Sequence, residues 1–192
     1  MIGTWTREEE PEVAIQRIFD GAARAFVELG VSGAGMGEIA RYVGCSRGTL
    51  YRYFKNRHDL HLAFVNDRAL RLVAELQAEL KEIEDPVAQL TGYILKALEK
   101  VRSTPSMAVW FSPTEAGRTA RMSRGSEVVL ALAETFVSTS WKETDDSDDE
   151  SGLRARWIVR VMISLLTMPA RTEEEERFLI ERFLVPGVLP GH

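Results

Sequence analysis

Apolar residues in this chain recur at intervals of three and four positions in almost every segment between its glycine and proline breakers. That spacing collects them on one face of an α-helix, which turns once every 3.6 residues. In the first such segment the repeating positions are Ile15, Ile18, Phe19, Ala22, Phe26 and Leu29. No segment shows the alternation of apolar and polar residues that a half-buried strand requires. The sequence therefore predicts an all-α fold.

Breakers divide the chain into expected helices. The first begins near Pro11 and stops at Gly30, because proline suits a helix start and glycine a helix end. Two short helices follow on either side of Gly44, Cys45 and Ser46, and a longer helix over 57–84 is ended by Pro86. Further helices are expected at about 86–102, 106–118, 121–141, 152–168 and 172–185, with a loop over 142–151.

A helix, a tight turn that contains glycine and a second helix together form a helix-turn-helix. We therefore expect a three-helix helix-turn-helix DNA-binding domain over 1–56 and a larger helical domain over 57–192. The helix over 57–84 would link the two.

Taken alone, the net charge of −5 argues against DNA as a partner. Electrostatic fields are local at physiological salt, however, because they decay over roughly 8–10 Å. Between Arg41 and Arg57 the chain carries five basic residues and no acidic one. This basic patch on an acidic body can dock on DNA phosphates.

The second short helix presents side chains suited to a major groove. Arg47 stands at its start, where residues reach base edges, and arginine can bond guanine through two hydrogen bonds. Gly48 lets the backbone approach a base closely, and Ser46 can cap the helix. The residues placed to bond phosphates are Thr49, Tyr51, Lys55 and Arg57.

The run from Ile39 to Leu60, with Gly-x-Ser-x-Gly-Thr-Leu-Tyr-x-Tyr-Phe-x-Asn inside it, resembles the DNA-binding signature of the TetR family of repressors. The likeness extends back through Ala22, Ala23, Phe26 and Gly30, about the first third of the chain. It implies an all-helical homodimer that binds a palindromic operator and carries a divergent ligand-binding domain. Such a protein usually represses until an effector binds.

The resemblance implies base-facing roles for Arg47, Gly48 and Tyr53, and phosphate-facing roles for Thr49, Tyr51, Lys55 and Arg57. Two positions depart from the family pattern. Gly35 and Met36 stand where a threonine and an aliphatic residue are usual, so only a backbone N–H contact to phosphate is expected there. Arg57 stands where a lysine is usual, which keeps the charge.

The part of the chain beyond residue 100 is rich in large, soft side chains. Plain core packing explains any one of them, but together they suit an adaptable apolar cavity. The residues assigned to an effector pocket are Met107, Trp110, Phe111, Trp141, Trp157 and Met162. We therefore expect a small, mainly apolar effector of unknown identity.

The segment from Trp157 to Met168 is too apolar for one core to cover, because Arg160, Ser164 and Thr167 are its only polar residues. A second copy of the chain can cover the rest. The helices at 121–141 and 152–168 are therefore expected to build a four-helix dimer interface. Its assigned residues are Val128, Leu132, Phe136, Ile158, Val161 and Leu165.

Other classes of protein receive little support. His58 and His61 lack a third metal ligand, no cofactor motif occurs, and no catalytic constellation indicates an enzyme. The single cysteine, Cys45, and the lack of a membrane-spanning stretch favour a cytoplasmic protein. The alternative that remains is a DNA-binding protein of the same fold controlled by a protein partner, without a small-molecule effector.

Overall fold

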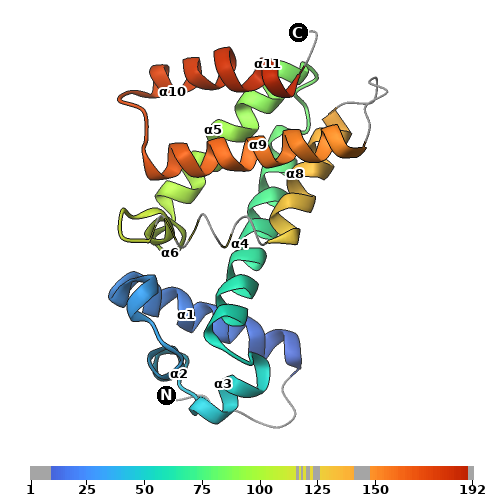
Figure 1. Ribbon diagram of the computed structural model, residues 1–192. Coiled ribbons are helices and arrows are strands. Elements are labelled where there is room, and N and C mark those ends of the chain that lie inside the picture. Colours follow the sequence, from blue (N-terminus) through green and yellow to red (C-terminus); the bar gives the residue numbers. More distant parts are fainter. Residues whose placement is uncertain are drawn as a thin grey trace.

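The computed structural model describes residues 10–115, 117, 119, 122, 126–140 and 148–189, and the regular structure within them is helical without any strand. The predicted all-α fold is therefore confirmed. Figure 1 shows α1, α2 and α3 at one end, α5 and α8 to α11 at the other, and α4 running between the two ends. The helices span α1 (Pro11–Gly33), α2 (Met36–Val43), α3 (Arg47–Tyr53), α4 (Arg57–Leu80), α5 (Pro86–Ser103), α6 (Pro105–Ala108), η1 (Val109–Phe111), α8 (Glu127–Ser140), α9 (Asp148–Thr167), α10 (Glu173–Leu179), η2 (Ile180–Leu184) and α11 (Val185–Val188).

Helix starts are fixed by local capping. The side chains of Asn56 and Asp85 each accept a hydrogen bond from the backbone N–H three residues on, at 2.9 and 2.7 Å. These bonds satisfy backbone donors that the first turn of a helix leaves open. Gly30 leaves the helical region at φ 72° and ψ 159°, so regular α1 breaks where the sequence predicted and one more turn leads toward α2.

The core of the end that holds α1, α2 and α3 extends into the rest of the chain. Its largest buried side chains include Phe26 of α1, Ile39 of α2 and Leu50 of α3. Leu60 and Phe64 of α4 belong to the same cluster, and so does Trp110 of η1. The first helices therefore share one core with the start of α4 and with η1.

A second core lies among α5, α9, η2 and α11. It includes two residues of the predicted dimer interface. Ile158 and Leu165 are only 5% and 8% exposed, since helices of the same chain cover them. Phe136 packs its ring 4.3 Å from that of Tyr93, and Leu132 lines an internal cavity. Val128 and Val161 are half-buried. Ile158 and Leu165 thus face inward, because α5 and the C-terminal helices cover them. The dimer interface predicted for the helices over 121–141 and 152–168 stays a prediction.

The exposed apolar side chains of this end lie elsewhere. Leu153 and Trp157 are exposed on α9, Met168 is exposed just after it, and Phe178 and Phe183 are exposed on α10 and η2. Trp157 lies against Gly187 of α11, and the rings of Phe178 and Phe183 are 6.1 Å apart. No helix in the described part of the chain is long and apolar enough to cross a membrane.

Candidate DNA-binding face and apolar cavity

The turn between α2 and α3 has the geometry of a helix-turn-helix. Gly44 ends α2 in the left-handed region at φ 77° and ψ 34°, which costs glycine little. Its N–H donates to the carbonyls of Ala40 and Arg41 at 3.0 and 3.2 Å. The Ser46 hydroxyl oxygen then accepts from the Thr49 N–H at 3.0 Å, so the predicted cap of α3 is confirmed.

The neighbouring helices hold this turn in place. Tyr42 of α2 donates its hydroxyl hydrogen bond to Glu28 of α1 at 2.7 Å, and Arg24 donates to the Tyr42 carbonyl at 2.8 Å. The bond to Glu28 raises the pKa of the Tyr42 hydroxyl. Burial raises the pKa of the Cys45 thiol, which keeps it in the unreactive protonated form near neutral pH.

The outer face of α3 carries basic and small residues. Arg47, Gly48, Tyr51 and Lys55 are exposed, whereas Leu50 beneath them is fully buried. The remaining predicted contacts, Thr49 and Tyr53, are half-buried. The Arg47 side chain crosses the start of α2 beside Gly37, where its Cδ lies 3.8 Å from the position of an added Cβ. Short α3 thus presents cationic groups and an open backbone on one side.

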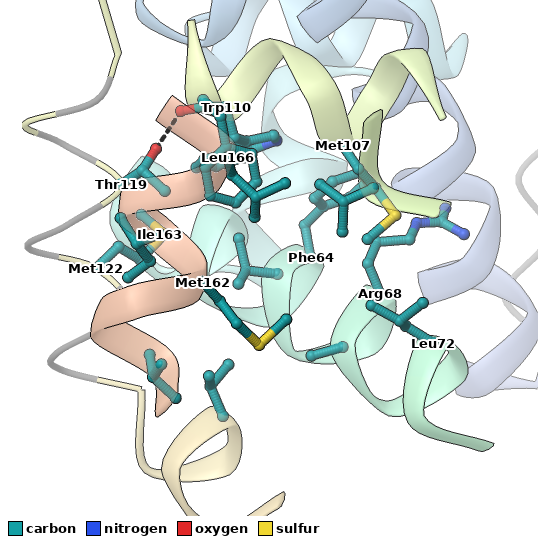
Figure 2. Close-up of a pocket in the computed structure, with 16 residues that line it drawn as sticks. Phe64, Arg68, Leu72, Met107, Trp110, Thr119, Met122, Met162, Ile163 and Leu166 are labelled. Atoms are coloured by element: carbon teal, nitrogen blue, oxygen red, sulfur yellow. Dashed lines mark hydrogen bonds between the residues drawn. The ribbon is translucent and has the colours of Figure 1, made fainter. Parts of the chain in front are cut away.

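An apolar cavity of about 160 Å³ lies beside the middle of α4, between Phe64 and Leu72. Its walls come from α4, α5, the segment from α6 to η1, α8 and α9. Figure 2 shows Phe64 and Leu72 of α4 facing Met162, Ile163 and Leu166 of α9 across it, with Trp110 and Met107 closing one end. Thr119 lines the cavity too, and its hydroxyl donates to the Trp110 carbonyl.

Comparisons with known proteins match both the helix-turn-helix and the whole length of the chain. The model for "Bacterial regulatory proteins, tetR family" matches residues 18–64, which span α1 to the first turns of α4. The chain is also 38% identical to the uncharacterized HTH-type transcriptional regulator Rv1255c of Mycobacterium tuberculosis, over all of this chain and 94% of that protein. This chain belongs to the tetR family of transcriptional regulators.

Solved structures extend the likeness of this TetR-family regulator to the whole fold. The repressor AlkX from a Dietzia species aligns with a TM-score of 0.67 at 18% identity, over 97% of each chain. FadR from Bacillus subtilis, solved with stearoyl-CoA, aligns with a TM-score of 0.61 at 17% identity, over 92% of this chain and 98% of that one. At these identities the likeness concerns the fold.

Two of the residues predicted to contact phosphate, Arg57 and Met36, direct their side chains into the protein. Arg57 turns inward, where its Nη2 donates to the carbonyls of Val31 and Ser32 at 2.6 and 2.9 Å. Arg57 therefore ties the start of α4 to the end of α1, and its contact with phosphate stays a prediction. The Met36 side chain is buried, so only its backbone N–H is left for a phosphate.

Gly35 precedes α2 without a side-chain cap, as its sequence implied. Glu38 occupies part of the space, since its carboxylate lies 2.8 Å from the position of an added Cβ on Gly35. A carboxylate there is stabilised by the positive end of the helix. A phosphate could reach this helix end only after Glu38 swings away, a competition that the sequence analysis missed although Glu38 stands three residues from Gly35.

The predicted pocket residues separate into two groups. Met107, Trp110, Phe111 and Met162 line the cavity. Trp157 does not, because it points to the exposed side of α9 next to α11. Trp141 lies outside the described residues. The sequence analysis missed the contributions of α4 and α5, such as Phe64, Leu72 and Val101, since their spacing is that of any core-facing helix.

His61, one of the two histidines considered for a metal, is buried with its ring 5.1 Å from Phe26 and 5.2 Å from Trp110. It serves the aromatic core. Within the described ranges, no three His, Cys, Asp or Glu side chains gather closely enough to hold a metal ion.

If Arg47 reads a base as predicted, Arg47→Ala should cost about 1–3 kcal/mol of operator binding and relax specificity. If Lys55 bonds a phosphate as predicted, Lys55→Ala should weaken binding to operator and random duplexes equally. It should also lower the slope of log affinity against log salt concentration by about one. Titrations of both duplexes at several salt concentrations measure the affinities and the slope. The control is Arg156→Ala, at an exposed position of α9. Equal, sequence-independent losses for both variants would contradict the assignment.

Proposed function

We propose that this regulator is a repressor that binds a palindromic operator as a homodimer, and that a small, mainly apolar molecule in the cavity changes its DNA affinity. The observation that carries the proposal is the position of Trp110. One side of this residue lines the cavity, and its ring also belongs to the core of the DNA-binding helices.

The aromatic contacts make this connection direct. The Trp110 ring lies 5.3 Å from Phe26 of α1 and 5.2 Å from His61 of α4, in edge-to-face geometry. Phe64, which also lines the cavity, stacks on Trp110 and contacts Phe26 at 5.1 Å. Protein cores are close-packed, so a ligand that displaces Trp110 or Phe64 must also shift the α1 side chain against them.

A second connection runs through the segment after η1. Glu115 is buried, and its carboxylate accepts a hydrogen bond from the Ser32 N–H at 2.7 Å. Four residues later Thr119 lines the cavity. A ligand that moves this segment would therefore pull on the end of α1, which Arg57 also holds.

The homodimer is supported by the exposed apolar side chains of the C-terminal helices. We define the C-terminal aromatic patch as Trp157, Phe178 and Phe183, which are 44%, 58% and 63% exposed. Large exposed rings on neighbouring helices are typical of protein interfaces. A two-fold dimer through this patch would pair two copies of α3 for successive major grooves about 34 Å apart.

The relatives add support for a cavity ligand. FadR from Bacillus subtilis was solved with stearoyl-CoA, and its fold covers nearly all of this chain. Linkage requires that the ligand bind the DNA-competent and DNA-incompetent arrangements unequally. A coupling of about 1–3 kcal/mol would change operator affinity roughly 5- to 150-fold.

The test is a screen of apolar and amphipathic compounds by thermal shift, followed by operator titration with each hit. Ala69→Phe should abolish both responses, because Ala69 lines the cavity and a larger side chain would fill it. Ala74→Phe, on the exposed side of the same helix, is the matched control and should respond like the parent. A ligand that stabilises the protein but leaves operator affinity unchanged would remove the sensing claim and favour control by a protein partner.

A further inference from the structure

A second apolar chamber of about 140 Å³ adjoins the first. Its walls come from α4, α5, α8 and α9, with Leu76, Leu90 and Ala133 among them. Five residues line both chambers, namely Ala69, Leu72, Val129, Val159 and Met162. The two chambers are therefore neighbours that share one partition.

The chambers follow one another along the helix bundle. The first is lined by α4 from Phe64 to Leu72, and the second by α4 from Ala69 to Leu76. On α5 the first chamber uses Val101, whereas the second uses residues 90–97. Since a helix rises 1.5 Å per residue, an offset of several residues on both helices sets the chamber centres roughly 7–10 Å apart. Together they form a long, narrow space.

The size of each chamber fixes how much carbon it can hold. A cavity of about 150 Å³ lined by apolar side chains accepts one benzene molecule. Each chamber here has about that volume. A ligand that fills both would therefore carry about twelve carbon atoms in line. A single compact ring would leave one chamber empty.

The shared partition is built from flexible side chains. Figure 2 shows Met162 reaching from α9 toward the α4 side, where Leu72 stands. A methionine side chain has three rotatable bonds and adapts its shape easily. Rotation of Met162 would join the two chambers without any movement of the backbone.

One charged side chain, Arg68, stands among the described residues that line the first chamber. Its guanidinium lies 5.1 Å from the centre of the Phe64 ring, and its buried Nε has no hydrogen-bond partner. Two carboxylates are near, Asp20 at 3.6 Å from Nη2 and Asp67 at 3.8 Å from Nε, both beyond hydrogen-bonding distance. Arg68 thus retains capacity for an anion at the end of the space that faces α1.

We infer that the ligand is an unbranched hydrocarbon chain of about twelve carbons that ends in a carboxylate, with the carboxylate on Arg68 and the chain passing Met162 into the second chamber. This inference rests on the proposed function and specifies its effector. It also indicates a route for the signal, because a carboxylate that captures Arg68 would draw it away from Asp20 on α1.

A chain-length series tests the inference. Straight-chain carboxylic acids of roughly six to sixteen carbons are titrated below their micelle-forming concentrations, and binding is followed by calorimetry and thermal shift. Each added methylene should tighten binding about fourfold, the effect of burying one such group. The gain should stop near twelve carbons, where both chambers are full.

Variants at each end of the joined chambers make the test specific. Ala133→Leu narrows only the second chamber, and should move the optimum toward about six carbons while leaving the shortest acids unaffected. Ala131→Leu, on the exposed side of the same helix, is its control. Arg68→Met should remove the preference for acids over alcohols of equal length, and Arg68→Lys should restore part of it.

The outcomes separate this inference from the proposed function. If compact apolar compounds bind and change operator affinity but binding does not grow with chain length, the elongated ligand is wrong and sensing stands. If acids bind no better than the matched alcohols, the role of Arg68 is wrong. If neither compact nor elongated compounds bind in the cavity, the proposed function itself fails.

Discussion

Replacing Gly21 with alanine will destabilise the DNA-binding core and remove operator binding with it. Gly21 is buried on α1 against the end of α2. An added Cβ would stand 2.8 Å from the Cα and 2.9 Å from the N of Val43, and it would also meet the Val43 side chain. Backbone atoms cannot rotate away as a flexible side chain can, so α1 and α2 would have to separate. We expect the free energy of unfolding to fall by about 3 kcal/mol, the upper part of the usual range for an overpacked core.

Gly48→Ala is the matched control, because the same methyl group there makes only an ordinary van der Waals contact. The nearest atom is the Ser46 hydroxyl oxygen, 3.7 Å away. Alanine should raise helix stability by up to about 1 kcal/mol. Operator binding should still fall, by about 1–3 kcal/mol, if the α3 backbone approaches a base.

Urea unfolding and operator titration of both variants separate the two effects. We expect Gly21→Ala to lose stability and DNA binding together, and Gly48→Ala to lose DNA binding alone. A parent-like midpoint for Gly21→Ala would mean that α1 and α2 do not pack as described. Parent-like operator binding by Gly48→Ala would remove Gly48 from the DNA contact.

The helices that could be predicted from the sequence are those with local signals at their ends. Pro11, Asn56 and Asp85 mark starts that the structure reproduces, because a cap or a proline acts within one turn. The expected helix over 106–118 instead divides into α6 and η1, and regular helix pauses at Ser112 to Thr114 around Pro113. The expected helix over 172–185 contains a π-helical turn at Ile180–Leu184. These details depend on tertiary packing.

The sequence did not indicate which neighbour each buried or basic side chain faces. The apolar stripe of α9 correctly indicated a buried face, but periodicity cannot distinguish cover by the same chain from cover by a second copy. Ile158 and Leu165 were therefore assigned to a dimer although α5 and the C-terminal helices bury them. The sequence could not fix the role of Arg57 for a similar reason, since a basic residue near a DNA-binding helix can bond carbonyl oxygens as well as phosphates.

Replacing Phe178 and Phe183 together with glutamate is expected to convert the regulator to a monomer, because it places two charges in the C-terminal aromatic patch. An interface core tolerates charge poorly. A monomer presents one α3 to one half-site and loses the gain from binding both at once, so operator affinity should fall by about 10²- to 10⁴-fold. Analytical ultracentrifugation at micromolar concentration and operator titration measure the two effects.

Leu70→Glu is the control for this double variant. Leu70 is 50% exposed on α4, so the substitution adds a charge to a surface of similar exposure outside the patch. It should leave the mass and the operator affinity unchanged. An unchanged helical circular-dichroism spectrum in the double variant would show that the fold survives, since both rings lie mostly in solvent within one chain. A double variant that remains dimeric would contradict the patch as the interface, and a parent chain that sediments as a monomer would contradict the dimer itself.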